Sequence, residues 1–372
     1  MNIWHFVGVR GPTRGMQTTI RMQPLMTKNI PSIFALLAFV SIAVASPAKA
    51  STDPKAFCVF DVAGASGFVY QLLREYQRSA LQNRVLLNMQ PYTDEDAAVR
   101  DFREGRCDLV AVTDMGARNF NDFTGSISAI GAIPYYEDLR VLLYGLSRPR
   151  LEPYLTQNGY QMLGVAPMGA AYLFVKDRAI DHVDALKGKR FSVFQGHHDA
   201  RHMVSFVGAE PVEAKISNFA NLFNSGAVDI SYAPAAAWEV LEMFRGAGEN
   251  GGIVRYPVGQ VTVQLFAREG TFTDGFVRDS RKTMARLYPE AIRIIRQFEE
   301  RVPEDRWIDI AAKDKRDYQE MLRQVRLDLL SSSDPESRLA AAVYHEDMMT
   351  ILRKIRCYTN PGGGECSDQN RE

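Results

Sequence analysis

Beyond the first fifty residues, apolar runs of strand length alternate with segments of helical spacing. A strand is predicted over 56–64, and the segment 67–80 that follows repeats its apolar side chains with helical spacing. Further strands are predicted over 85–92 and 107–115, with a short helix over 94–104 between them. Apolar strands in this β-α-β-α-β order are typical of a parallel sheet that helices cover on both faces.

The alternation restarts further along the chain, again as strands joined by short helices. Strands are predicted over 159–168, 170–177, 189–196, 209–216, 227–234, 251–258 and 261–269, with helices over 200–207 and 218–225. From about residue 274 the pattern is helical and rich in charge, with helices predicted over 288–301, 312–330 and 336–356. The whole pattern predicts an α/β fold of two lobes, with parallel-rich sheets and a C-terminal helical layer.

The 322 residues after position 50 are enough for two compact lobes, each with its own core. Lobe 1 is predicted over 51–172 and about 262–290, and lobe 2 over 173–261. The remaining helices, over 291–372, are expected to pack on both lobes.

The first fifty residues carry the features of an export signal. Lys28 precedes an apolar stretch over 33–45, and Ala48-Lys49-Ala50 offers small residues at the two positions that a signal peptidase recognises. The apolar stretch is shorter than the roughly 20 residues of a membrane-spanning helix. We therefore expect a cleavable signal peptide over 26–50 that begins at the true start, Met26. Because no Cys follows the cleavage site, no lipid anchor is expected, and the mature chain is predicted to be soluble in the periplasm.

Charge limits the kinds of partner. Five of the 44 basic residues and none of the 44 acidic residues lie within positions 1–50, which leaves 39 basic residues and a net charge of about −5 for the mature chain. A mildly acidic chain argues against nucleic acid as the main partner. A small-molecule solute is the expected partner, no cofactor is indicated, and a monomer is expected.

Four cysteines remain after export. An even number in an oxidising compartment favours two disulfides, although four cysteines allow three pairings. We favour Cys58 with Cys107, which each lead an apolar run, and Cys357 with Cys366, which flank a Pro-Gly loop. Buried thiols are the alternative. A metal site is less favoured, because neither Cys-x-x-Cys nor a Cys/His spacing is present.

Candidate ligand contacts lie where predicted strands end. Open α/β sheets bind ligands at the carboxyl ends of their strands, which here precede the loops 61–67, 113–119, 195–199 and 231–238. In the first loop Ser66 precedes a helix, whose free N–H groups favour an anion or a polar oxygen. The alternative for Ser66 is a helix cap in a tight turn.

The most suggestive polar cluster is His197, His198 and His202, next to Asp199. His198 and His202 are four residues apart, so on a helix they share a face. A metal site needs a third converging ligand, which the sequence does not show. Contact with a solute by one histidine, or a capping or surface role, are the alternatives.

Two stretches, 94–138 and 159–234, carry motifs in a recognisable order. In the first, a helix leads to Gly-x-x-Asp-hydrophobic, then to a strand that ends in small residues, then to a Phe-rich segment before Pro134-Tyr135. In the second, NGYQMLG is followed by an aromatic strand, DALKGKRFSV, VGAEPV and NLFNSGAVDISYAP. This order resembles the extracytoplasmic solute-binding receptors of tripartite ATP-independent periplasmic (TRAP) transporters. More narrowly, it resembles a divergent branch in which some members carry the label of RND-type efflux transporter components.

The resemblance implies a two-lobed, periplasmic-binding-protein-like fold of the type II kind. Such a receptor captures a small polar solute in the cleft between its lobes and delivers it to inner-membrane transporter subunits. The residues that we expect to bind the solute are Asp61, Ser66, Asp114, Arg118, Tyr172, Gln195, His198, Asp229 and Tyr232, with Phe174 and Trp238 as further aromatic contacts.

One position departs from the family pattern. On the strand after Leu-Lys-Gly, TRAP receptors usually carry an Arg that holds the carboxylate of an organic acid, and this chain has Ser192 there. Without that guanidinium a bidentate carboxylate contact is lost, unless Arg190 or Arg201 replaces it. The sequence therefore leaves open whether the solute is a carboxylate.

Two other functions stay open at this point. One is a periplasmic component of an RND-type efflux or envelope assembly without a solute of its own, for which long heptad hairpins would be expected. The other is a hydrolase on the same fold, centred on His198. No residue set with recognisable catalytic spacing is present, so we do not expect an enzyme.

Overall fold

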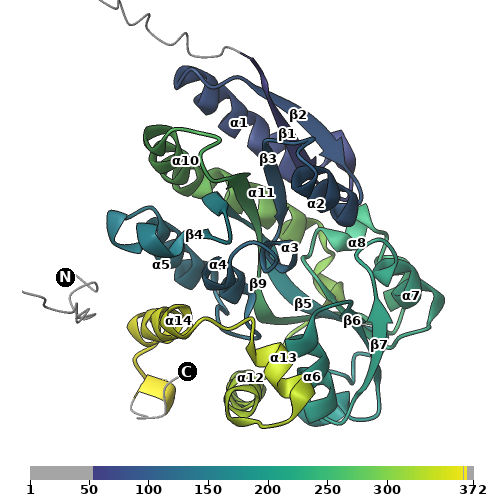
Figure 1. Cartoon of the computed structure of the whole chain (residues 1–372). Coiled ribbons are helices and arrows are strands. Elements are labelled where there is room, and N and C mark those ends of the chain that lie inside the picture. Colours follow the sequence, from purple (N-terminus) through teal and green to yellow (C-terminus); the bar gives the residue numbers. More distant parts are fainter. Residues whose placement is uncertain (1–52, 363, 367–372) are drawn as a thin grey trace, which may run out of the picture. The chain divides into compact units, whose positions relative to one another are not determined.

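The computed structural model describes residues 53–362 and 364–366, so the predicted signal peptide and its start lie outside the described residues. The strands of the described chain join one ten-stranded sheet (Figure 1). They are β1 (Lys55–Phe60), β2 (Leu87–Tyr92), β3 (Leu109–Thr113), β4 (Thr156–Gln157), β5 (Tyr160–Val175), β6 (Arg190–Phe194), β7 (Glu210–Ala214), β8 (Ile230–Ala233), β9 (Gly252–Arg268) and β10 (Trp307–Ile308).

The sheet has two halves that share its two long strands. The first half has the strand order β2-β1-β3-β9-β5, and the second half continues as β9-β5-β8-β6-β7. β9 pairs with β3 through residues 263–267, whereas β5 pairs with β8 through residues 172–175. Both long strands therefore run from one lobe into the other, and the predicted two-lobed α/β fold is confirmed.

Two pairs of predicted strands are in fact single strands, so the sequence prediction was wrong there. The runs 159–168 and 170–177 form β5, and the runs 251–258 and 261–269 form β9. The register of β5 against β9 shifts just before Gly169, which has a φ of 129°. Such bulges bend a strand and change the face that its side chains occupy, so the apolar pattern is interrupted although the strand continues.

The pairing within each half is mixed. β1 pairs in parallel with β2 and β3, and β6 pairs in parallel with β7 and β8. The long strands pair antiparallel with each other, β9 also with β3 and β5 also with β8, whereas the short β10 pairs in parallel with β9. The β-α-β units are therefore parallel as predicted, and the antiparallel pairs are made by the two strands that connect the lobes.

Helices cover both halves of the sheet. They are α1 (Phe68–Gln82), α2 (Glu95–Arg103), α3 (Asp114–Ala117), α4 (Asp122–Gly125), α5 (Tyr136–Leu146), α6 (His198–Phe206), α7 (Phe219–Ser225), α8 (Ala237–Val240), α9 (Phe244–Ala247), α10 (Asp274–Arg286), α11 (Tyr288–Arg301), α12 (Ala312–Ser331), α13 (Pro335–Ala341) and α14 (Glu346–Thr359). α1, α2, α10 and α11 pack on strands of the first half, and α6 and α7 pack on β6. Among the described residues, no helix is long and apolar enough to cross a membrane.

The C-terminal helices connect the two lobes. α12 and α13 pack on α6 of the second half, and α14 packs on α4 and α5 of the first half. Figure 1 shows this layer in yellow along one side of both lobes. The single helix predicted over 336–356 is wrong, because it divides into α13 and α14. Between them the buried Tyr344 turns to Asp199, and the His345 ring accepts a hydrogen bond from the Asp347 N–H at 3.3 Å, which starts a new helix.

The predicted lobe limits fall inside the long strands. The change after residue 172 lies within β5, and the change after residue 261 lies within β9. These limits stay a prediction, because both strands continue through them without a loop.

Two disulfides join the four cysteines in the favoured pairing. Cys58 of β1 bonds Cys107, just before β3, with a Cα–Cα distance of 5.9 Å. Cys357 of α14 bonds Cys366 with a Cα–Cα distance of 5.4 Å. The first bridge connects neighbouring strands and is fully buried, so it fixes the sheet beside the loops that follow β1 and β3.

Removal of the first bridge is expected to cost more stability than removal of the second. In the loop-entropy model, a bridge across 49 residues contributes about 4 kcal/mol and one across 9 residues about 3 kcal/mol. The variants Cys58→Ala/Cys107→Ala and Cys357→Ala/Cys366→Ala are therefore compared by urea unfolding of the oxidised proteins. A larger loss for the second pair would contradict this order.

Candidate ligand-binding cavity

A cavity of about 190 Å³ lies where loops from both lobes meet. Each of the four loops that follow β1, β3, β6 and β8 contributes to its wall, and so do β5, β9 and α11. These are the loops to which the sequence assigned the ligand, because the carboxyl ends of the strands in both halves face the same space.

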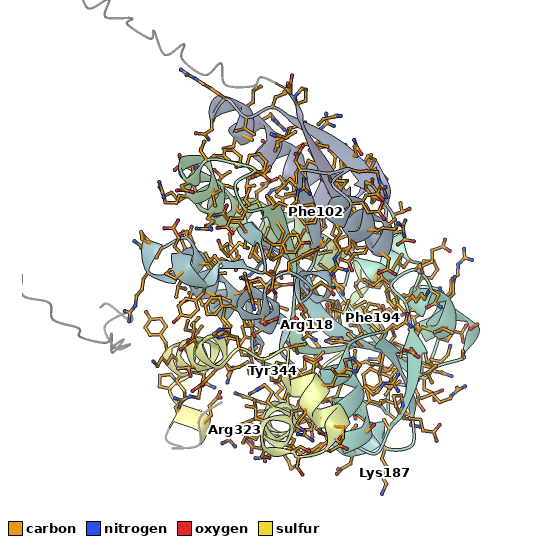
Figure 2. The ribbon with its side chains drawn as sticks, viewed as in Figure 1. Phe102, Arg118, Lys187, Phe194, Arg323 and Tyr344 are labelled. Atoms are coloured by element: carbon orange, nitrogen blue, oxygen red, sulfur yellow. A yellow bond between two sulfur atoms is a disulfide. The ribbon has the colours of Figure 1, made fainter. Side chains whose placement is uncertain are left out.

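The wall of the cavity is mainly apolar. The first lobe contributes Phe60, Phe68 and Met115, and the second contributes Phe194 and Phe219. Figure 2 labels Phe194 at the end of β6, beside the junction of the two lobes. An apolar wall of this kind favours a ligand that buries hydrocarbon, with a few polar groups to orient it.

Asp61 follows β1 and supports the first turn of α1. Its carboxylate accepts hydrogen bonds from the N–H groups of Ala63 and Val69 at 2.9 Å and of Tyr70 at 3.2 Å. A Cβ on Gly67 would overlap this carboxylate, so only glycine fits there. Burial raises the pKa of Asp61, and the three backbone donors partly offset this effect.

Asp114 follows β3 and begins α3, with its side chain at the cavity wall. Burial raises its pKa to about 7, although Arg118 and backbone N–H groups, including that of Thr262, act in the opposite direction. The other titratable groups near it are Glu95 of α2 and Tyr232 of β8. Asp61 and Asp114 therefore place two carboxyl groups at the ends of neighbouring strands.

A buried ion pair joins the two lobes beside the cavity. Arg118, which follows α3, donates to both carboxylate oxygens of Asp199 of α6 at 2.9 Å. Tyr344 donates to the same carboxylate at 2.9 Å, and Figure 2 shows Arg118 and Tyr344 close together. Burial acts to raise the pKa of Asp199, but the charge of Arg118 outweighs it and holds the pKa well below its usual value. Asp199 is therefore ionised, and its negative charge neutralises Arg118.

Two further polar side chains reach the cavity. The His197 Nδ1 atom lies 2.8 Å from the Tyr232 hydroxyl, and its Nε2 atom lies 3.2 Å from Asp199. Burial lowers the pKa of His197 to about 4, so the ring is neutral. Gln260 of β9 is 4% exposed and donates from Nε2 to the Pro134 carbonyl at 3.0 Å, which leaves its Oε1 atom without a partner.

A second, polar cavity lies next to the first. The two share wall residues, among them Phe60, Met115 and Phe194. The second is lined by the acidic residues at the start of α2, by Lys215 and by Gln195.

The structure brings together only part of the predicted ligand set. Asp61, Asp114 and Tyr232 line the main cavity, and Arg118 lies beside it in the ion pair. The other predicted residues lie elsewhere: exposed Ser66 donates to the Ala63 carbonyl, Tyr172 donates to Glu299, Gln195 lines the second cavity, His198 is absent from the wall, and Asp229 binds Arg190. Phe174 and Trp238 pack in the core of the second lobe.

Some residues of the wall carried no signal in the sequence. His197 was in the histidine cluster, but only the fold shows that it, rather than His198, faces the cavity. Gln260 lies in a long strand whose two faces alternate, and nothing in its neighbours marks it as a ligand residue. The predicted set therefore located the loops better than the individual side chains.

The question of a replacement arginine has a clear answer. The Ser192 hydroxyl is buried 2.7 Å from that of Ser231. Arg190 binds Asp229 and Arg201 lies 3.8 Å from Glu213, both outside the cavity. Within the described part of the chain, no Lys or Arg side chain lines the main cavity.

The described residues do not form a metal site. Across 53–362 and 364–366, no three His, Cys, Asp or Glu side chains converge as a metal site would require. His202 instead lies 2.8 Å from Asp328.

Two lobes joined by two long strands, with a cavity between strand-end loops, define the class of two-lobed solute-binding proteins. The model of the family "Solute-binding protein AdeT 1/2" matches residues 77–371. The chain belongs to this family.

Individual relatives agree with this assignment. The "Probable solute-binding protein AdeT1" of Acinetobacter baumannii is 31% identical over 309 residues, which cover 83% of this chain and 99% of the relative. Among solved structures, a TRAP periplasmic solute-binding protein from Desulfovibrio salexigens, with bound orotic acid, has a TM-score of 0.66 at 12% identity and covers 82% of this chain and 99% of its own. One from Ralstonia eutropha, with bound (S)-2-acetolactate, has a TM-score of 0.63 at 14% identity and covers 82% and 98%. The sequence resemblance to this fold is confirmed.

Proposed function

We propose that the chain is a periplasmic receptor that encloses a small solute between its lobes and delivers it to a membrane partner. The observation that carries this proposal is the cavity itself, whose wall comes from strand-end loops of both lobes. A ligand that touches both lobes stabilises their closed arrangement more than an open one.

The long strands supply a route for hinge motion. β5 and β9 are the sheet connections between the lobes, and the bulge before Gly169 lies midway along β5. Bulged backbone bends more readily than a regular ladder. Export to the periplasm is supported by the signal sequence and by the two disulfides, which persist in an oxidising compartment.

An adaptor function without a solute gains no support from the described chain. The longest described helix is α12, with 20 residues, and it packs on the second lobe rather than forming an extended hairpin.

The receptor function predicts a ligand that stabilises the folded chain. Native mass spectrometry of the protein purified from periplasm identifies a bound compound, which is then added back to dialysed protein. At 100 times its Kd, the ligand is expected to raise the unfolding free energy by about 2.7 kcal/mol.

A matched pair of variants localises that effect. Ala63 lines the cavity, whereas Ala65 is an exposed residue of the same loop outside it. Ala63→Trp fills the cavity and is expected to abolish the ligand-induced stabilisation, and Ala65→Trp is expected to retain it. Equal stabilisation of both variants would place the solute elsewhere and refute the proposal.

A further inference from the structure

The ionisable side chains on the wall of the main cavity are acidic rather than basic. Its wall has the carboxyl groups of Asp61 and Asp114, and within the described residues it has no basic side chain apart from the neutral His197. The nearest guanidinium, Arg118, is held by both oxygens of Asp199. An anionic solute would meet two carboxyl groups and no free cation, and buried charge without a partner is strongly unfavourable.

Within the described residues, neither carboxyl group forms an ion pair with a Lys or Arg of its own, although the charge of Arg118 acts on Asp114 from beside the cavity. Asp61 accepts three backbone N–H groups, and backbone groups near Asp114, including that of Thr262, act to lower its pKa. These neutral donors hold the carboxylates in place without cancelling their charge. A cation in the cavity would therefore be attracted to both carboxyl groups, since the one nearby guanidinium, that of Arg118, is shared with Asp199.

Gln260 adds an independent observation. Gln260 lines the cavity and is only 4% exposed. Its Oε1 atom has no hydrogen-bond partner. The bond from Nε2 to Pro134 fixes the amide, so the free atom is an acceptor. An unpaired buried acceptor is costly, and a ligand N–H that reaches this atom would satisfy it.

The second cavity is also lined by more acidic than basic side chains. Asp94, Glu95 and Asp96 line it together with a single basic residue, Lys215. Because the two cavities share part of their walls, the described residues around both carry more acidic than basic side chains.

We propose that the solute of this receptor is an apolar cation, such as a hydrophobic amine, whose hydrocarbon part contacts the aromatic wall while its ammonium group binds Asp114 and Gln260. This inference rests on the proposed receptor function. It separates the chain from the solved structures of similar fold, whose bound orotic acid and acetolactate are organic acids.

Three probes of equal skeleton test the charge preference: 4-phenylbutylamine, 4-phenylbutanol and 4-phenylbutyrate. Their affinities for the full exported chain are measured by calorimetry at pH 8, where Asp114 is mostly ionised. The amine is expected to bind about tenfold more tightly than the alcohol, and the carboxylate more weakly than either. Equal affinities, a preference for the carboxylate, or no binding of the amine would overturn the inference.

Variants assign the preference to one side chain. Asp114→Asn keeps the shape but removes the charge, so the amine is expected to lose about tenfold in affinity while the alcohol keeps its own. The control Asp309→Asn removes an exposed carboxylate that pairs with Arg255 outside the cavity and should change neither affinity. An amine preference that survives Asp114→Asn would refute the assigned contact.

The experiments distinguish a failure of the cation inference from a failure of the receptor proposal. If Ala63→Trp abolishes binding of a co-purified acid, the receptor function stands and the cation inference fails. If neither a co-purified compound nor any of the three probes binds, both proposals fail.

Discussion

Replacing Arg118 by Met is expected to lower the unfolding free energy by about 3–5 kcal/mol. The substitution leaves the fully buried Asp199 with the hydrogen bond that Tyr344 donates but without its main counter-charge. Breaking one side of a buried ion pair is costly because the remaining charge stays desolvated. Since the pair joins α3 to α6, the same change also removes a contact that holds the two lobes together.

An exposed pair provides the control. Arg190 and Asp229 have a similar bidentate contact, but their side chains are 43% and 26% exposed. Arg190→Met is therefore expected to change stability little, since water screens and replaces the lost interaction. Urea unfolding measures both variants. A loss no larger for Arg118→Met than for Arg190→Met would show that the buried pair does not stabilise the fold.

Replacing Glu95 by Gln is expected to stabilise the protein at pH 8 and to have little effect near pH 4.5. Burial raises the pKa of Glu95 to about 7, against the opposing hydrogen bonds from the Thr113 N–H and hydroxyl, and Asp114 and Asp96 raise it further. The folded state therefore binds a proton more tightly than the unfolded state, so stability falls as pH rises from about 4.5 to 7. Gln resembles the protonated acid and avoids this loss, which amounts to up to about 3 kcal/mol above pH 7.

The measurement is the difference in unfolding free energy between Glu95→Gln and the parent chain at several pH values. Other titrating groups, His197 included, largely cancel in this difference. Glu104→Gln, at the exposed C-terminal end of the same helix, is the control and should give a small, nearly constant difference. A Glu95→Gln variant that is less stable at pH 8 than at pH 4.5, relative to the parent, would contradict the argument.

The fold was largely predictable, and particular residues show why. The spacing of Phe68, Leu72, Leu73 and Tyr76 predicted α1, and the last three of these side chains are buried on one face of the helix. Local patterns could not show that 159–168 and 170–177 form one strand, since the bulge at Gly169 alters the pattern without ending the ladder. Nor could they show the break between α13 and α14, which depends on a contact from Tyr344 to a residue 145 positions away.

The candidate cavity was predictable only to the level of loops. Strand ends can be located from the sequence, and the carboxyl ends of strands converge in this fold, so Asp61, Asp114 and Tyr232 of the predicted set line the cavity. Tyr172 was predicted to contact the solute, but it does not line this cavity. Adjacent residues of a strand point to opposite faces, and its neighbour Ala171 lines the wall instead.

The sequence by itself predicted the lobed α/β architecture and the absence of an Arg at position 192, and it favoured the cysteine pairing that the structure has, whereas the export signal stays a prediction. These features depend on local composition, periodicity and order, which the chain carries directly. Only the tertiary structure decided that Arg190 and Arg201 do not replace that Arg, that Asp199 neutralises Arg118, and that the carboxyl groups of Asp61 and Asp114 remain at an otherwise apolar wall. The physical reason is that a charge acts through its distance to other charges and through its burial, and both are set by residues far apart in the chain.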